Sequence, residues 1–392
     1  MSTYHFDKHT TRRGTNCVKW DETSLEDIIP LWVADMDFEV LPAITEALKK
    51  RVEHGIFGYA LVSDSYYESI IDWFRRRHGW NIRREWIQYT TGVVPAISAV
   101  LRALTMPGER VLVMSPVYNC FFSSIRNNGC EVLESALQVV IKDSQPTYTI
   151  DWNDFEAKCA DEKTTVFLLC NPHNPAGRVW TREELKRMND ICMKHQVKVI
   201  SDEIHCELVM PGYTFTPFAA VSEECASNSV VCGSPSKSFN TAGLQMAHII
   251  CQNAEWRHRI DRAININEIC DVNPFAPIAV ETAYKEGDEW IDQLNRYLFD
   301  NYQALLAYVR KELPQMKVYI LEGTYLVWLD IRETGMTSDQ LTRRLLHEGR
   351  VWVNSGTTYG PVTGEGYIRI NIATQRDRLM EGLRRIRQVM GK

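Results

Sequence analysis

The 392-residue sequence lacks an excess of basic residues and lacks an apolar run long enough to cross a membrane. Its 44 Lys and Arg against 50 Asp and Glu give a net charge of −6, which argues against nucleic-acid binding because phosphate contacts need a basic surface. Arg102 interrupts the apolar run 93–106, whereas a spanning helix needs about 20 apolar residues. Neither nucleic acid nor a membrane is therefore expected as a partner.

The 11 cysteines lack a CxxC pair and any other metal-ligand spacing. They are odd in number and scattered, which predicts free thiols in the core of a cytoplasmic protein. The first 27 residues carry no apolar core of the secretory type. Residues 205–207 (His-Cys-Glu) have metal-ligand side chains but no partners at a matching spacing, so we expect no metal site.

The sequence also lacks internal repeats, low-complexity tracts and long linkers. Four nearly continuous apolar runs, each ending at a polar turn, predict buried strands at 110–114, 165–170, 197–201 and 229–232. Thr181 and Glu184 form a capping box that predicts a helix between the second and third of these strands. Alternating strands and helices indicate an α/β fold with a mostly parallel sheet that helices cover on both faces. The family resemblance described below implies that this sheet has seven strands.

The character of the sequence changes near residue 285. Amphipathic helices are predicted at 290–309 and 338–349, and short strands at 317–321, 325–330 and 367–372. We therefore expect three parts. They are an N-terminal segment (1–45) that packs against a small α+β domain, a large domain (46–284), and the small C-terminal domain itself (285–392).

Lys237 is the residue on which the functional prediction depends. It lies between serines just after the strand predicted at 229–232, where burial would lower the pKa of its ammonium group and free the amine to form a Schiff base. A solvated surface charge is the ordinary alternative for a single lysine. However, Asn174 and Asp202 follow the two preceding strands, and ligands of parallel sheets bind at the carboxyl ends of the strands. We therefore expect an amide, a carboxylate and a lysine to face one crevice.

An anion site is predicted where a helical run begins. Gly92, Val93 and Val94 lie at this point, and backbone amides at a helix N-terminus bind phosphate groups. Ser234 and Ser236 would add hydroxyl donors beside the lysine. An ordinary turn is the alternative for Gly92 alone.

Arg369 lies inside the apolar strand predicted at 367–372. A buried arginine has to be paired. Two partners remain open, the α-carboxylate of a substrate, which arginine binds in a bidentate manner, and an internal carboxylate of the protein.

In their order along the chain, these residues resemble the fold-type I, aspartate-aminotransferase-like superfamily of pyridoxal phosphate enzymes. The shared motifs are Asn-Pro-x-Asn-Pro-x-Gly (171–177), Asp-x-x-His (202–205) and Ser-x-Ser-Lys (234–237), followed by Arg369. A finer similarity, to the MalY/PatB branch of cystathionine β-lyase-like C–S lyases, rests on segments 16–21, 32–38, 58–59, 116–118, 240–245 and 322–330. Aminotransferases of the superfamily usually carry a phosphate-binding arginine eight residues after the lysine, where this chain has Gln245.

The resemblance implies pyridoxal 5'-phosphate as cofactor and assigns roles around it. Asp202 would keep the pyridine nitrogen protonated, and Asn174 and His205 would donate hydrogen bonds to the phenolate oxygen. Tyr118 would stack on the ring. Tyr59 would reach the phosphate of a neighbouring subunit in a homodimer with active sites at the interface.

The resemblance also implies a substrate and a reaction. Arg369, Ala34 and Asn174 would bind the carboxylate of an amino-acid substrate, and Lys237, Asp202 and Tyr118 would carry the catalysis. The predicted function is β-elimination from L-cystathionine or a related cysteine S-conjugate, giving a thiol, pyruvate and ammonia. An aminotransferase is the alternative, and a regulatory protein that binds the same cofactor is a third reading.

Overall fold

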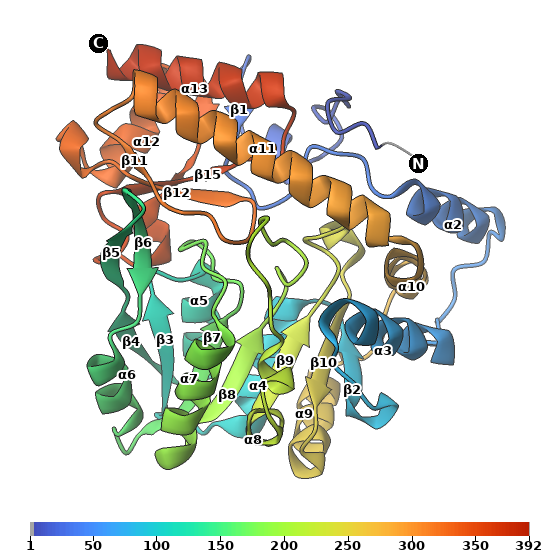
Figure 1. Cartoon of the computed structure of the whole chain (residues 1–392). Helices are drawn as coiled ribbons and strands as arrows, with labels where there is room; N and C mark the ends of the chain where they lie inside the picture. Colours follow the sequence, from blue (N-terminus) through green and yellow to red (C-terminus); the bar gives the residue numbers. More distant parts are fainter. Residues whose placement is uncertain (1–3, 392) are drawn as a thin grey trace.

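A seven-stranded sheet forms the centre of the larger part of the molecule. The computed structural model describes residues 4–391 (Figure 1), so residues 1–3 and 392 of the predicted terminal parts lie outside the described residues. Across the sheet the strands are β2 (Ile87–Thr90), β10 (Ala247–Cys251), β9 (Ser229–Gly233), β8 (Lys198–Asp202), β7 (Thr164–Cys170), β3 (Arg110–Ser115) and β4 (Glu131–Ala136). Only β10 runs antiparallel to its two neighbours. The predicted α/β class with a mostly parallel sheet is confirmed.

Helices cover both faces of this sheet (Figure 1). On one face lie α4 (Val93–Leu104), α5 (Asn119–Asn127) and α9 (Ala254–Ile266), and on the other lie α6 (Trp152–Cys159), α7 (Arg182–Lys194) and α8 (Glu223–Ser227). Along β3, Val111 and Val113 pack into the first layer, whereas Leu112 and Met114 pack into the second. This alternation explains why the strand reads as a continuous apolar run.

The four strands predicted in the large domain agree with the structure to within about one residue. Strands β3, β7, β8 and β9 contain or closely overlap the four predicted runs. The Thr181 hydroxyl accepts the amide hydrogen of Glu184, and the Glu184 carboxylate accepts from the Thr181 amide, so the capping box begins α7 as expected.

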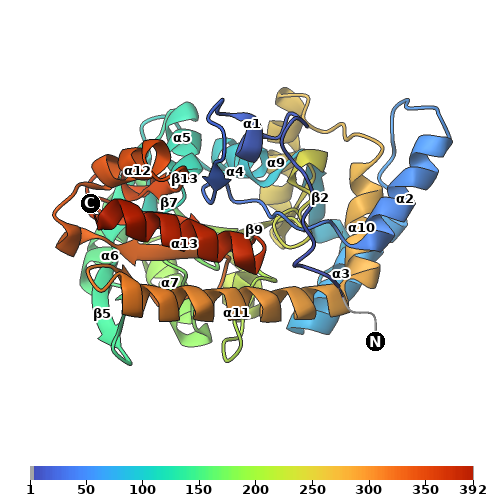
Figure 2. The same cartoon turned by 90° about the horizontal axis from the view of Figure 1, so that it is seen from above.

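A second, antiparallel sheet lies in the C-terminal part. Its strands are β11 (Lys317–Val318), β12 (Leu326–Asp330), β15 (Tyr367–Asn371) and β14 (Asn354–Ser355). Helices α11 (Asp288–Glu312), α12 (Ser338–His347) and α13 (Arg376–Met390) pack around it, and Figure 2 shows α11 and α13 side by side. The strand predicted at 317–321 is shorter than expected, because pairing with β12 ends after two residues.

The N-terminal segment contacts this C-terminal part. Strand β1 (Ile29–Pro30) pairs in parallel with β13 (Val351–Trp352), and α1 (Val18–Asp21) precedes it. The remaining regular elements are α2 (Pro42–Glu53), α3 (Asp64–His78), α10 (Ala276–Glu286) and the hairpin of β5 (Gln138–Lys142) and β6 (Gln145–Thr149). We keep the division at residues 45 and 284 as a proposal that these contacts support. No helix of the described chain is long and apolar enough to span a membrane.

Candidate active site

A cavity of about 300 Å³ opens at the carboxyl edge of the seven-stranded sheet. Small-molecule pockets of proteins start at about this size, and ligands of such sheets bind at this edge. Ten of the predicted site residues line it, namely Ala34, Gly92, Val93, Val94, Tyr118, Asn174, Asp202, His205, Ser236 and Lys237. Four residues that were not predicted from the sequence also line it, namely Cys170, Ile204, Ala242 and Met246. Cys170 ends β7, Ile204 follows β8 by two residues, and the other two lie between the lysine and β10.

Lys237 projects from the loop after β9 into this cavity. Its Nζ donates a hydrogen bond to the Ala34 carbonyl oxygen at 2.7 Å. Burial lowers the pKa of Lys237, and Arg369 lowers it further, while Asp35 and Asp202 act in the opposite direction. A lysine with a lowered pKa carries more free amine at neutral pH, as a nucleophile for carbonyl compounds requires.

Asp202 ends β8 at the base of the same cavity. Its Oδ1 accepts a hydrogen bond from the Ile204 amide at 3.1 Å. Burial raises the pKa of this carboxyl to about 7, and Lys237 opposes the shift. A cation placed against the carboxyl would favour its ionised form, so the site suits a protonated ring nitrogen.

The first turn of α4 offers backbone amides to the cavity. Gly92 precedes the helix, and no side chain caps it. The amides of Val93 and Val94 have no intrahelical partner at this position, so they are available to an anion. Ser236 also lines the cavity.

Ser234, which was predicted to bind the cofactor, lies outside the cavity lining. Its hydroxyl donates to the Met246 carbonyl at 2.7 Å and accepts the Ser236 amide hydrogen at 3.1 Å. In the described structure this hydroxyl joins the lysine loop to the residue before β10.

Arg369 is buried on β15 with neutral partners. Its guanidinium donates to Asn174 Oδ1 at 3.1 Å and to the Trp32 carbonyl at 2.8 Å, and it lies over the Tyr359 ring. Its Nε has no hydrogen-bond partner. Among the described residues it forms no ion pair with a carboxylate, so the internal salt bridge considered from the sequence is absent there. A buried guanidinium of this kind suits an external carboxylate.

His205, Tyr118 and Tyr59 have contrasting surroundings. Burial lowers the pKa of His205 to about 3, so its ring is neutral, and its Nδ1 has no hydrogen-bond partner. Tyr118 lines the cavity, and burial raises the pKa of its hydroxyl. Tyr59 is fully exposed and does not line the cavity of its own chain, so its predicted role requires a second copy.

The His-Cys-Glu fragment has a partner that the sequence did not reveal. His78 lies close to Cys206 and Glu207, and their ligand atoms are within 4.8 Å of one another. The expectation that the fragment lacks ligand-type neighbours is therefore wrong. However, Glu207 Oε1 already accepts hydrogen bonds from His78 and Trp73 at 2.7 Å each, and Arg77 Nε lies 3.8 Å from its other oxygen. These contacts satisfy the carboxylate and place a cation beside it.

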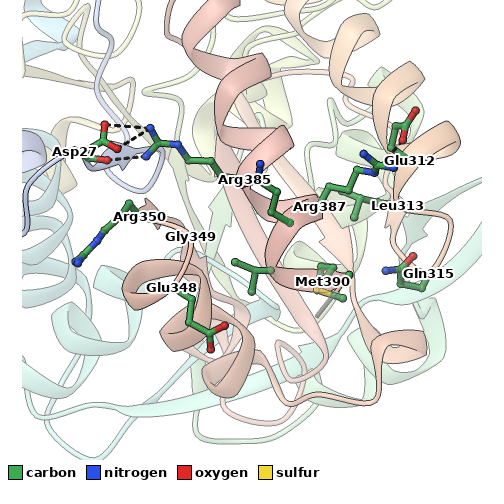
Figure 3. Close-up of a pocket in the computed structure, with 13 residues that line it drawn as sticks. Asp27, Glu312, Leu313, Gln315, Glu348, Gly349, Arg350, Arg385, Arg387 and Met390 are labelled. Atoms are coloured by element: carbon green, nitrogen blue, oxygen red, sulfur yellow. Dashed lines mark hydrogen bonds and ion pairs between the residues drawn. The ribbon is translucent and has the colours of Figure 1, made fainter.

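A larger cavity of about 690 Å³ lies at the C-terminal ends of α11, α12 and α13 (Figure 3). Its charged side chains include Arg385, which pairs with Asp27, and Arg387, which pairs with Glu312. The described residues that line it include no lysine, cysteine, histidine or serine. It therefore offers no amine, thiol, imidazole or serine hydroxyl, and two of its carboxylates, Asp27 and Glu312, are paired with arginines. The smaller cavity, which contains a buried lysine, is the candidate active site.

The groups around the smaller cavity fit pyridoxal 5'-phosphate. Lys237 offers an amine for its aldehyde, Asp202 a carboxyl for its ring nitrogen, and the start of α4 offers free amides for its phosphate. The unpartnered Nδ1 of His205 and Nε of Arg369 are buried polar atoms that a ligand of this polarity could satisfy.

Comparisons with known proteins agree with this chemistry. The family model for aminotransferase class I and II matches residues 26–386. The chain is 42% identical to cystathionine beta-lyase PatB of Bacillus subtilis, over 98% of this chain and all of that one. It is 32% identical to protein MalY of Escherichia coli, over 97% of each.

A solved structure extends the agreement to three dimensions. The PLP-bound putative aminotransferase from Clostridium difficile superposes with a TM-score of 0.95 at 38% identity, over 99% of this chain and all of that one. The similarity to the MalY/PatB branch is likewise confirmed over nearly the whole chain. The chain therefore belongs to the aminotransferase class I and II family.

Proposed function

We propose that the chain is a pyridoxal phosphate-dependent carbon–sulfur β-lyase. It would cleave L-cystathionine or a related cysteine S-conjugate to a thiol, pyruvate and ammonia. The observation that carries the proposal is the amine of Lys237, partly buried in one cavity with Asp202. It lies near the guanidinium of Arg369, which has no carboxylate partner among the described residues. The similarity to cystathionine beta-lyase PatB supports the choice of reaction.

The residues that would hold the cofactor are those that line the cavity. Gly92, Val93, Val94 and Ser236 line the cavity and would bind the phosphate, while Asp202 would contact the ring nitrogen. When bound, pyridoxal phosphate supplies a carbonyl carbon that reacts with amines and a ring that accepts electrons from Cα.

The chain's own side chains would position the substrate and move its proton. Arg369, with Asn174 and the backbone at Ala34, would bind the α-carboxylate and orient the Cα–H bond. The Nζ of Lys237 would take the Cα proton, since its lowered pKa leaves more of the amine in the basic form. The thiolate would leave Cβ with the electron pair of the C–S bond, and water would convert the remaining fragment to pyruvate and ammonia.

An aminotransferase is the alternative, because transamination begins with the same proton removal. We would incubate the purified protein with pyridoxal phosphate and L-cystathionine, without a keto acid, and measure pyruvate. Continued release of pyruvate and ammonia in equal amounts is expected. Turnover that appears only after a keto acid is added would overturn the lyase proposal, and no turnover in either case would favour the regulatory reading.

We also propose that the protein is a cytoplasmic homodimer. All 11 cysteines are free, and eight of them are buried, which suits a reducing compartment. Tyr59 and Leu61 are 100% and 95% exposed in the single chain, and a second copy would cover them.

A further inference from the structure

The segment of residues 32–38 contributes Ala34 to the wall of the candidate active site, and charged side chains contact the segment away from the cavity. Arg12 donates to Asp35 Oδ2 at 2.6 Å and to Asp37 Oδ1 at 2.8 Å. Lys19 lies 3.1 Å from Asp37 Oδ2 and 3.5 Å from Asp35 Oδ1. The Lys19 and Asp37 side chains are fully buried, so this charge cluster is an internal part of the fold.

Two asparagines fix the backbone of the same segment. The side-chain amide of Asn371 donates to the carbonyls of Val33 and Asp35, at 2.6 Å each. Asn240 donates to the carbonyls of Met36 and Phe38, at 3.0 and 2.9 Å. The carbonyl groups before and after that of Ala34 are thus held.

The Ala34 carbonyl is the group of this segment that contacts the lysine of the candidate active site. It accepts hydrogen bonds from Lys237 Nζ at 2.7 Å and from the Tyr325 hydroxyl at 3.0 Å. The amine of Lys237 is therefore held by a backbone atom whose position depends on Asp35, the next residue.

Several charged or titratable groups face Lys237. They are Asp35, Asp202, Arg369, Cys120, His205 and, through the shared carbonyl, Tyr325. Among the charged neighbours of Lys237, the Asp35 carboxylate has the largest effect, and it raises the pKa that burial lowers. Arg12 and Lys19 form ion pairs with Asp35 and partly neutralise its charge. The electrostatic effect of Asp35 on the Lys237 amine therefore depends on these two cations as well.

We propose that Asp35 is a positioning residue for Lys237. Held by Arg12 and Lys19, it fixes the Ala34 carbonyl against the amine and places a partly neutralised negative charge beside it. This inference rests on one part of the proposed function, namely that Lys237 is the reactive amine. It holds equally for a lyase and for an aminotransferase.

Asp35→Asn and Arg12→Gln test the proposal because they change the charge near Lys237 in opposite directions. We would titrate the absorbance of the bound cofactor with pH, since it reports protonation at the nitrogen of Lys237. Asp35→Asn removes a negative charge, so the midpoint should move to lower pH. Arg12→Gln exposes the Asp35 charge, so the midpoint should move to higher pH, and Arg12→Lys should restore it.

Arg13→Gln is the matched control. Arg13 is adjacent in sequence, and within the described chain its hydrogen bonds go to the carbonyls of Thr23 and Leu25, while its charge acts on Asp21. The titration of the Arg13→Gln variant should therefore coincide with that of the unaltered protein. A second readout needs no cofactor. Reductive methylation of Lys237 by formaldehyde in the full cofactor-free chain, followed by mass spectrometry across pH, should show the same two opposite shifts.

A purely structural cluster predicts a different result. Loss of packing would move both variants in the same direction, and that outcome, or an unchanged titration of Asp35→Asn, would overturn the proposal. Asp35→Asn preserves shape at a partly exposed side chain, so it decides the matter even if Arg12→Gln does not fold. Absence of pyruvate release would contradict the lyase proposal alone, because the methylation readout remains.

Discussion

At the scale of single residues, the proposed chemistry depends on Lys237. Its amine is desolvated, and it is directed into the cavity by the hydrogen bond to the Ala34 carbonyl. Lys198 offers a comparison at the opposite end of β8, because burial lowers its pKa as well although it lies outside the cavity. A lowered pKa alone therefore does not identify the base, whereas the cavity does.

Lys237→Ala is expected to reduce pyruvate release by about 10²–10⁴-fold or more, since it removes the proton-transferring group. Pyridoxal phosphate should still bind without a covalent bond, because the groups placed for its phosphate and ring are unchanged. Steady-state assays and absorbance spectra would measure the two effects. Lys198→Ala serves as the control, and an equal loss of activity there would contradict the assignment.

Arg369 is buried, charged and without a carboxylate partner among the described residues, a costly state that a substrate carboxylate would relieve. A charge-assisted hydrogen bond contributes about 1.5–3 kcal/mol, so Arg369→Ala should lower kcat/KM by about 10–100-fold, chiefly through KM. Arg332→Ala is the control, because Arg332 lies over the Tyr367 ring near the same sheet but pairs with Asp330. Unchanged kinetics with a lowered melting temperature would indicate that Arg369 is structural.

At the scale of elements, the strands found from the sequence are those with continuous apolar runs. Strand β10 was not predicted, because His248 interrupts its pattern. The structure accommodates this side chain by burying it, which lowers its pKa to about 3 and keeps it neutral. The strand ends that carry Asn174, Asp202 and Lys237 could be predicted because polar residues follow buried strands directly.

The charge cluster behind the active-site wall could not be predicted in the same way. Arg12, Lys19 and Asp35 lie in a segment with little periodicity, and their contacts depend on how the chain folds back on itself. Similarly, the contact of His78 with Glu207 joins residues that are 129 positions apart. Periodicity and local motifs do not indicate contacts between residues that are distant in sequence, so these contacts could be found only in the folded structure.

The carboxyl end of β8 gives the cofactor-free protein an unusual dependence of stability on pH. Burial raises the pKa of Asp202 to about 7 and of Glu203 to about 8, so the folded state binds more protons than the unfolded state up to those values. Their contribution to stability is therefore lost as pH rises toward 7 and 8. Burial also lowers the pKa of His173, His205 and His248 to about 3, and their contribution is lost as pH falls below 6.5.

Among these five groups, the three histidines outweigh the two carboxyls below pH 6.5, and the two carboxyls alone act above it. The melting temperature of the cofactor-free protein should therefore be highest near pH 6.5, the ordinary pKa of histidine. Glu203→Gln removes one of the two groups and should flatten the decline between pH 6.5 and 8. Differential scanning calorimetry across pH would measure both effects, and a melting temperature that rises up to pH 8 would contradict the account.

At the scale of the whole molecule, the connection between α2 and α3 carries apolar side chains into solvent. Ile56, Phe57, Tyr59 and Leu61 are all more than half exposed, and Figure 1 shows this connection at the edge of the molecule. Exposed apolar groups that gather in one segment are typical of an interaction surface. A second copy of the chain would cover this surface, and it would also bring Tyr59 of one chain to the active site of the other.

Leu61→Asp is expected to shift the protein from dimer to monomer, because it places a charge at a surface that the second copy would bury. Sedimentation velocity would measure the change. Val362→Asp is the matched control, since Val362 is 87% exposed and lies in a different part of the chain. Equal effects of both substitutions, or a monomeric unaltered protein, would contradict the proposed dimer.

The same arrangement predicts that two impaired chains can restore one another. Tyr59→Ala should weaken cofactor binding in the partner's site, and Lys237→Ala should inactivate its own site. In a mixed dimer, the site of the Tyr59→Ala chain keeps Lys237 and receives an intact Tyr59 from the other chain. Co-refolded mixtures should therefore release pyruvate faster than either variant alone. Activity no higher than the average of the two separate variants would mean that Tyr59 does not act across the interface, and each chain would then have to complete its site from its own residues.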